Sequence, residues 1–109
     1  MNVLIVDDEE LARSRLQRFI ESEQLGEVIA LASNGVQAIE AVETFLPDVV
    51  LMDIQMPTMD GLEAARHLAQ LDTPPAIIFC TAYDEFAIEA FNVQAVGYLL
   101  KPVRKEELK

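Results

Sequence analysis

Short, unbroken runs of apolar residues recur along the chain and predict β-strands. The runs cover residues 3–6, 28–32, 49–52, 76–80 and 98–100. Most of them are rich in Val, Ile and Leu and do not alternate with polar residues, which is typical of strands covered on both faces. We therefore expect a parallel sheet of five strands.

Between these runs, apolar residues recur at helical spacing and predict helices. The predicted apolar faces are Ala12, Leu16, Phe19 and Ile20; Ala38, Ile39, Val42, Phe45 and Leu46; Leu62, Ala65 and Ala69; and Ala87, Ala90 and Phe91. A fifth helix is expected to follow Pro102, over residues 104–109, and to be short. The strict alternation of strands and helices favours an α/β fold, a doubly wound sheet with helices on both faces.

Composition and charge limit what such a fold can do. With 109 residues, of which 51% are hydrophobic, the chain suits one domain with a substantial core. The 19 Asp and Glu outweigh the 8 Lys and Arg and give a formal net charge of −11. Because so acidic a surface repels nucleic acids and anionic membranes, we expect this domain to bind neither directly. A lone Cys80 and the lack of a signal peptide or membrane span in the sequence predict a cytoplasmic domain without an intrachain disulfide.

Polar side chains follow four of the five predicted strands. Asp7 and Asp8 follow the first run, Asp53 the third, Thr81 the fourth and Lys101 the fifth. In open α/β sheets ligands bind beyond the carboxyl ends of the strands, so we expect these side chains to share one shallow cleft. Two carboxylates about 5 Å apart repel each other by roughly 3 kcal/mol at an effective dielectric of about 20, which favours a bound cation. Carboxylate oxygens suit Mg²⁺, which also accepts phosphate oxygens.

This set of side chains predicts phosphoryl transfer onto a carboxylate. A carboxylate beside Mg²⁺ can attack phosphorus and become an aspartyl phosphate. Lys101 and the hydroxyl of Thr81 would then neutralise and hydrogen-bond the phosphoryl oxygens.

Taken singly, each of these residues has a plainer interpretation. The acids at 7–10 would cap the first helix and complement its dipole. Asp53 would lie in a turn, Thr81 would be the N-cap of the fourth helix, and Lys101 would be a surface lysine. Their joint occurrence at the strand ends of one sheet favours the shared site.

Four segments of the chain carry a family resemblance: VLIVDDEELAR at the start, PDVVLMDIQMPTMDGLEAAR in the middle, then IIFCTAYDEFA and AVGYLLKPV. In this order and at these spacings they resemble the receiver domain of bacterial two-component response regulators, over essentially the whole chain. The resemblance implies a flavodoxin-like sheet of order 2-1-3-4-5 with a shortened final helix, and residues 1–109 as the receiver domain.

The resemblance also implies a magnesium site and a phosphoacceptor. By position, Asp53 resembles the phosphoacceptor and a metal ligand. Asp8 resembles a direct Mg²⁺ ligand, and Asp7 a partner that acts mainly through water. Gln55, two residues after the acceptor, would contribute its backbone carbonyl to the metal.

Three further positions resemble the switch residues and the phosphate-binding lysine of the family. Thr81 resembles the hydroxyl that moves toward the phosphoryl group, and Tyr98 the aromatic residue that turns inward with it. Lys101 resembles the lysine that binds phosphate, and the family implies a cis peptide bond between it and Pro102.

The implied partners are a sensor histidine kinase and, in a homodimer, a second receiver. The segment TAYDEFAIEAFNVQAVGYLLKPV further resembles receivers joined to a LytTR-type DNA-binding domain, as in alginate and autolysin regulators. It implies that an output DNA-binding domain follows this domain in the natural protein. The function that the resemblance implies is a phosphorylation-controlled signalling switch. Two alternatives are a phosphohydrolase that turns over an external substrate and a degenerate receiver that only binds proteins. Gln55 stands where such a hydrolase has a second acid, and the complete set of site residues argues against degeneracy.

Overall fold

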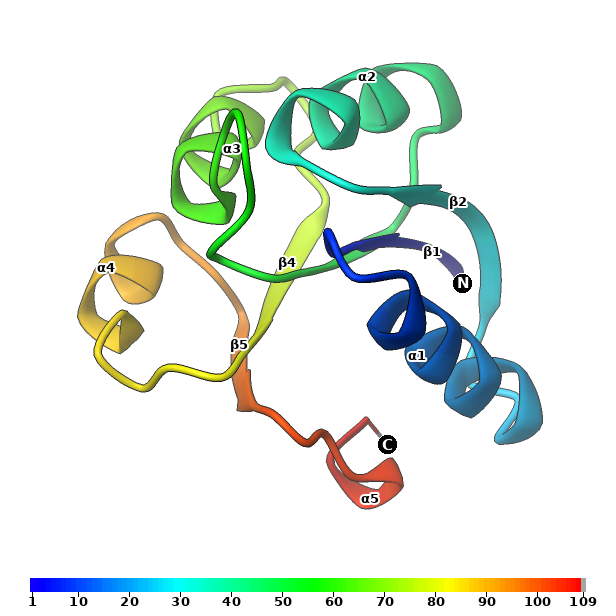
Figure 1. Cartoon of the computed structure of the whole chain (residues 1–109). Helices are drawn as coiled ribbons and strands as arrows, with labels where there is room; N and C mark the ends of the chain where they lie inside the picture. Colours follow the sequence, from blue (N-terminus) through cyan, green and yellow to red (C-terminus); the bar gives the residue numbers. More distant parts are fainter. Residues whose placement is uncertain (109) are drawn as a thin grey trace.

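The computed structural model describes residues 1–108, which form a five-stranded parallel β-sheet flanked by helices (Figure 1). The strands are β1 (Asn2–Val6), β2 (Glu27–Ala32), β3 (Val49–Met52), β4 (Ala76–Thr81) and β5 (Gly97–Leu100). Their order is β2-β1-β3-β4-β5, and every neighbouring pair is parallel. Each strand agrees with its predicted run to within one residue at either end, and the predicted fold class and strand order are confirmed.

Helices cover both faces of the sheet. They are α1 (Glu10–Ser22), α2 (Gly35–Phe45), α3 (Gly61–Leu68), α4 (Ala87–Asn92) and α5 (Lys105–Leu108). Figure 1 shows α2, α3 and α4 on one side of the sheet and α1 and α5 on the other. The last helix predicted over 104–109 is observed as the short α5, and residue 109 lies outside the described residues. None of the helices in the described part of the chain is long and apolar enough to span a bilayer.

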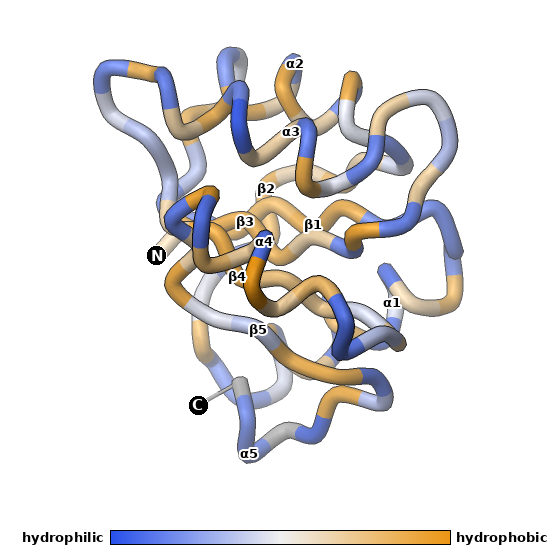
Figure 2. Tube along the Cα trace, turned by 90° about the vertical axis from the view of Figure 1, so that its left-hand side faces the viewer, coloured by the Kyte–Doolittle hydropathy of each residue, from blue (hydrophilic) through white to orange (hydrophobic). Residues whose placement is uncertain are grey.

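Alternate residues of β1 enter two separate cores, one on each face of the sheet. Leu4 and Val6 pack with residues of α2, α3 and α4, whereas Val3 and Ile5 pack with residues of α1. Figure 2 shows the apolar strands in the middle of the molecule and most hydrophilic segments around them. Because both faces are covered, all four residues are buried, which explains why the apolar run is unbroken.

Four side chains that the helical spacing assigns to buried faces are exposed instead: Phe45, Leu46, Ala87 and Phe91. Helix α2 ends at Phe45, and Leu46 adopts a left-handed backbone conformation (φ 50°) that leaves its side chain 74% exposed. In the short α4, Ala90 makes the core contact, and Phe91, the next residue around the helix, is 81% exposed. The predicted burial of these four residues is therefore wrong.

Leu46→Gly is expected to stabilise the protein by about 1 kcal/mol. A side chain at positive φ costs about 1–2 kcal/mol relative to glycine, which is the residue most common at this position after a helix. Since Leu46 is largely exposed, its removal sacrifices little packing. Urea unfolding measures the change, with Glu40→Gly, at an exposed position inside α2, as the control that loses about 1 kcal/mol. Similar losses in both variants would contradict the prediction.

Candidate functional site

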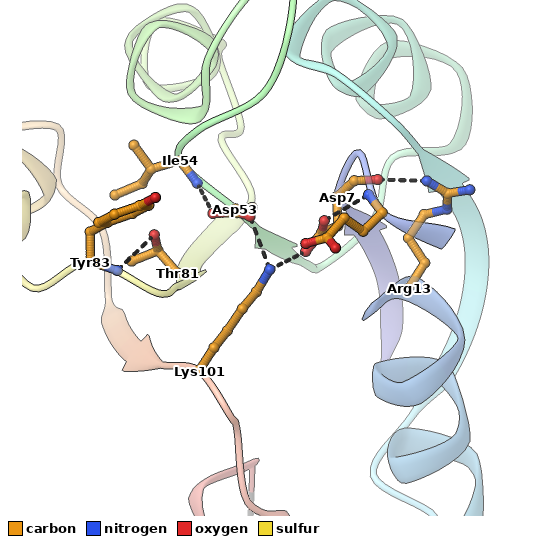
Figure 3. A network of polar contacts seen from close by, with 8 residues as sticks. Asp7, Arg13, Asp53, Ile54, Thr81, Tyr83 and Lys101 are labelled. Atoms are coloured by element: carbon orange, nitrogen blue, oxygen red, sulfur yellow. Dashed lines mark hydrogen bonds and ion pairs between the residues drawn. The ribbon is translucent and has the colours of Figure 1, made fainter. Parts of the chain in front are cut away.

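Three backbone hydrogen bonds bring the predicted site residues to one edge of the sheet. The amide of Asp7 donates to β2, that of Asp53 to β1 and that of Lys101 to β4, over 3.0, 2.9 and 2.8 Å. Each bond continues the pairing of two strands just beyond the end of one of them. The side chains of these residues and of Thr81 therefore lie together at the carboxyl ends of the strands (Figure 3).

The ammonium of Lys101 lies between two buried carboxylates. Its Nζ donates to Oδ2 of Asp7 at 2.8 Å and to Oδ2 of Asp53 at 3.0 Å, and these acids are only 1% and 8% exposed. Burial alone lowers the pKa of Lys101, but the hydrogen bonds and charges of the two acids outweigh it and raise that pKa above its ordinary value. The interpretation of Lys101 as a surface lysine is therefore wrong. The Lys101–Pro102 peptide bond is cis, as predicted.

The carboxylates of Asp7, Asp8 and Asp53 form one acidic cluster. One oxygen of each residue lies within 4.8 Å of the corresponding oxygens of the other two. Lys101 brings one positive charge to three negative ones, so the cluster retains excess negative charge. Asp8 is exposed and opens the cluster to solvent. This set of hard oxygen donors with excess negative charge fits a hydrated divalent cation such as Mg²⁺.

Asp7 also holds the turn that leads into α1. Its Oδ1 accepts a hydrogen bond from the amide of Glu9 at 2.9 Å, and its backbone oxygen accepts one from Nη1 of Arg13 at 2.6 Å. Helix α1 has no side-chain cap hydrogen bond, so the capping part of the plainer interpretation is wrong, whereas Glu10 lies in the first turn and complements the helix dipole as predicted. The contact with Arg13 was not predicted, because a spacing of six residues across a turn follows neither the helical nor the strand period.

Asp53 is held between its own loop and the start of α3. Its Oδ1 accepts a hydrogen bond from the amide of Ile54 at 2.7 Å, and the amide of Gly61 donates to the carbonyl of Ile54 at 2.7 Å. A Cβ atom at position 61 would overlap the backbone oxygen of Asp53, so this close approach requires glycine. This role of Gly61 was not predicted, although a glycine directly after the helix-capping Asp60 is a usable signal. Gln55 is exposed in the same loop, and its role as a carbonyl ligand stays a prediction.

Thr81 and Tyr98 both contact the backbone of Tyr83. Oγ1 of Thr81 accepts a hydrogen bond from the amide of Tyr83 at 3.3 Å, and the hydroxyl of Tyr98 donates to the carbonyl of Tyr83. Thr81 is fully buried at the end of β4, and α4 begins only at Ala87, so its interpretation as an N-cap is wrong. Tyr98 is half-buried, with its ring edge-on to Phe79 at a centroid distance of 6.5 Å. The two predicted switch residues are thus linked through one loop residue.

Cys80 is expected to resist alkylation in the folded protein. Burial raises the pKa of its thiol to about 12, although the nearby charge of Lys101 lowers it. At pH 8 the reactive thiolate is then roughly one part in ten thousand. Iodoacetamide labelling followed by intact-mass measurement should show an unmodified native protein and one label per chain in urea. Rapid labelling of the native protein would contradict the prediction.

Known proteins match this chain over nearly its whole length. The family model for the response regulator receiver domain matches residues 3–109. The positive alginate biosynthesis regulatory protein of Pseudomonas aeruginosa is 56% identical over 109 residues, which are 99% of this chain and 44% of that protein. The sensory transduction protein LytT of Bacillus cereus is 42% identical over 108 residues, which are 99% of this chain and 44% of that protein. The chain thus spans less than half the length of these curated relatives.

Solved structures also match this chain over nearly its whole length. The response regulatory domain of mrkE from Klebsiella pneumoniae has a TM-score of 0.92 at 32% identity, covering 99% of this chain and 88% of that one. The CheX-CheY-BeF3-Mg+2 complex from Borrelia burgdorferi has a TM-score of 0.92 at 26% identity, covering 99% and 83%. The resemblance to receivers of the LytTR-type group is confirmed by the alginate regulator and LytT. Because the family model accounts for all but the first two residues, and the sheet has the order that the resemblance implies, the chain belongs to the response regulator receiver domain family.

Proposed function

We propose that this domain is a phosphorylation switch in which Asp53 accepts a phosphoryl group from the phosphohistidine of a sensor histidine kinase. The observation that carries the proposal is the position of Lys101 between Asp7 and Asp53, beside the exposed carboxylate of Asp8. Transfer of an anionic group to a carboxylate needs positive charge around the acceptor. The lysine provides one such charge, and the acidic cluster can hold a second.

Two side chains would act on the phosphoryl group itself. An oxygen of Asp53 forms a bond to phosphorus while the bond from phosphorus to the histidine nitrogen breaks. Lys101 stabilises the phosphoryl oxygens by charge, and the hydroxyl of Thr81 hydrogen-bonds them. Both groups already lie at the strand ends next to the acceptor (Figure 3).

The acidic cluster would hold Mg²⁺ during this transfer. Asp8, Asp53 and the backbone carbonyl of Gln55 are the proposed direct ligands, and Asp7 would act through water. When bound, Mg²⁺ supplies positive charge that offsets the charge of the phosphoryl oxygens. The structural relative from Borrelia burgdorferi is a complex that contains Mg²⁺ and BeF3, which supports this assignment.

We further propose that phosphorylation changes the surface formed by α4, β5 and α5. A shift of Thr81 would reach Tyr98 because both contact the backbone of Tyr83. Exposed large apolar side chains gather on α4 and β5 and just before β5: Ile88, Phe91, Val96 and Leu100. Such a surface is suited to bind a second copy of the domain or an output domain. Since the relatives are regulatory proteins more than twice as long, we propose a LytTR-type DNA-binding output domain beyond residue 109.

Incubation with Mg²⁺ and acetyl phosphate, followed by intact-mass measurement, tests the proposal. The parent protein is expected to gain one phosphoryl group, and Asp53→Ala and samples with excess EDTA are expected to gain none. The variant lacks the nucleophile, whereas the chelator removes the cation that the acidic cluster needs. An adduct on Asp53→Ala would assign a different acceptor. No adduct on the parent, even with a kinase as donor, would favour a domain that only binds other proteins.

A further inference from the structure

Arg13 makes a contact with the acidic site that the reaction as proposed does not use. It lies on α1, six residues after Asp7, and its Nη1 donates to the backbone oxygen of Asp7 at 2.6 Å (Figure 3). The contact is partly buried. The two other arginines of α1 have different surroundings: Arg15 lies over the ring of Phe19 at 5.2 Å, and Arg18 is exposed. Arg13 is therefore the arginine of α1 that contacts the turn carrying the acids.

With this contact, every hydrogen-bonding atom of Asp7 has a partner. Its amide donates to β2 at 3.0 Å, and its Oδ1 accepts from the amide of Glu9 at 2.9 Å. Its Oδ2 accepts from Lys101 at 2.8 Å, and its backbone oxygen accepts from Arg13. The partners come from β2, the following turn, the end of β5 and α1. Asp7 is thus held at each polar atom, and Arg13 provides the only one of these contacts that fixes its carbonyl.

That carbonyl belongs to the peptide group that joins Asp7 to Asp8. Because a peptide group is planar, the direction of the carbonyl also fixes the amide and the Cα atom of Asp8, from which its side chain starts. Asp8 is exposed, and no hydrogen bond or ion pair from the described residues 1–108 holds its side chain beside the two neighbouring carboxylates. Its position beside Asp7 and Asp53 therefore depends on the backbone that Arg13 holds.

We propose that Arg13 is a positioning residue for the metal site: it holds the Asp7–Asp8 peptide so that the carboxylate of Asp8 faces the cation. The inference rests on the proposed magnesium-dependent function. The guanidinium also carries a positive charge, which by itself opposes cation binding. Loss of the positioning contact would weaken Mg²⁺ binding, whereas loss of the positive charge would strengthen it. The Mg²⁺ affinity of a variant without Arg13 therefore distinguishes the two roles.

The experiment measures the dissociation constant for Mg²⁺ by titration calorimetry in the parent protein and three variants. Arg13→Met keeps an unbranched side chain but removes the donors and the charge, and Arg13→Lys keeps a donor group and the charge. Arg18→Met, at an exposed position on the same helix, is the matched control. Partners that orient metal ligands typically contribute 10–100-fold in affinity, so Arg13→Met is expected to weaken Mg²⁺ binding about tenfold. Arg13→Lys should recover most of the loss, and Arg18→Met should stay within about twofold of the parent.

Phosphorylation by acetyl phosphate over a range of Mg²⁺ concentrations gives a second readout. The half-saturating Mg²⁺ concentration of Arg13→Met should rise as its dissociation constant does, while its maximal rate should stay within about twofold of the parent rate. If Arg13 only stabilised the fold, Arg13→Met would lower the maximal rate instead. If Arg13→Met bound Mg²⁺ as tightly as the parent or more tightly, Arg13 would act on the cation only through charge repulsion. Either result would overturn the inference while leaving the proposed function intact. Absence of Mg²⁺ binding by the parent would instead refute the proposed function, and the inference with it.

Discussion

Lys101→Met is expected to lower the free energy of unfolding by about 3 kcal/mol in metal-free solution. Removing one partner of a buried ion pair typically costs about 3–5 kcal/mol, and we take the lower end because the lysine side chain is 23% exposed. The variant leaves the buried carboxylates of Asp7 and Asp53 facing each other without a cation. Added Mg²⁺ should restore part of the loss, because a ligand that binds only the folded state stabilises it. Urea unfolding with EDTA and with Mg²⁺ measures both effects.

Arg104→Met is the control for this experiment. Arg104 is an exposed cation three residues after Lys101, and its loss should change stability by less than about 0.5 kcal/mol. If Lys101→Met were as stable as Arg104→Met in EDTA, the ion pairs of Lys101 would contribute nothing to folding. Lys101→Met should also fail to accumulate the phosphoryl adduct, since it lacks the charge that stabilises the transferred group.

Gly61→Ala is expected to destabilise the protein by about 3 kcal/mol and to impair phosphorylation. The added Cβ would overlap the backbone oxygen of Asp53 and would lie 3.0 Å from Cα of Ile54. Backbone atoms cannot turn away as a side chain can, so either α3 or the acceptor loop must move. Urea unfolding measures the loss of stability, and the yield of the phosphoryl adduct measures the displacement of Asp53.

Gly97→Ala separates this effect from a general cost of replacing glycine. The nearest atom to a Cβ at position 97 is a side-chain carbon of Ile78 at 3.2 Å, which can adjust by rotation. Because glycine is unfavourable inside a strand, the substitution should cost less than about 1 kcal/mol and leave phosphorylation unchanged. Equal losses at positions 61 and 97 would show that contact with Asp53 is not the cause.

The sheet and the convergence of the site were predictable because both depend on rules that act along the chain. Residues 3–6 form an unbroken apolar run since each residue enters one of two cores, and such runs identify the strands. The carboxyl ends of parallel strands meet at one edge, which is enough to bring Asp7, Asp53 and Lys101 together before any distance is known.

The remaining features depend on where elements end and on contacts between them. Helical spacing assigns Leu46 to the buried face of α2, but it does not show that the helix stops one residue earlier. The contact of Arg13 with a carbonyl and the approach of Gly61 to the acceptor depend on how α1 and α3 pack against the sheet. Neither contact follows a helical or strand spacing that can be recognised in a single sequence.

The ion pair between Lys101 and Asp7 joins residues 94 positions apart. During synthesis on the ribosome, the acceptor and its acids therefore emerge well before the lysine that completes their surroundings. On the proposed mechanism, a nascent chain cannot respond to its kinase until β5 has joined the edge of the sheet and delivered Lys101. The domain can thus be phosphorylated only after its last strand has been added to the sheet, and incomplete chains do not signal.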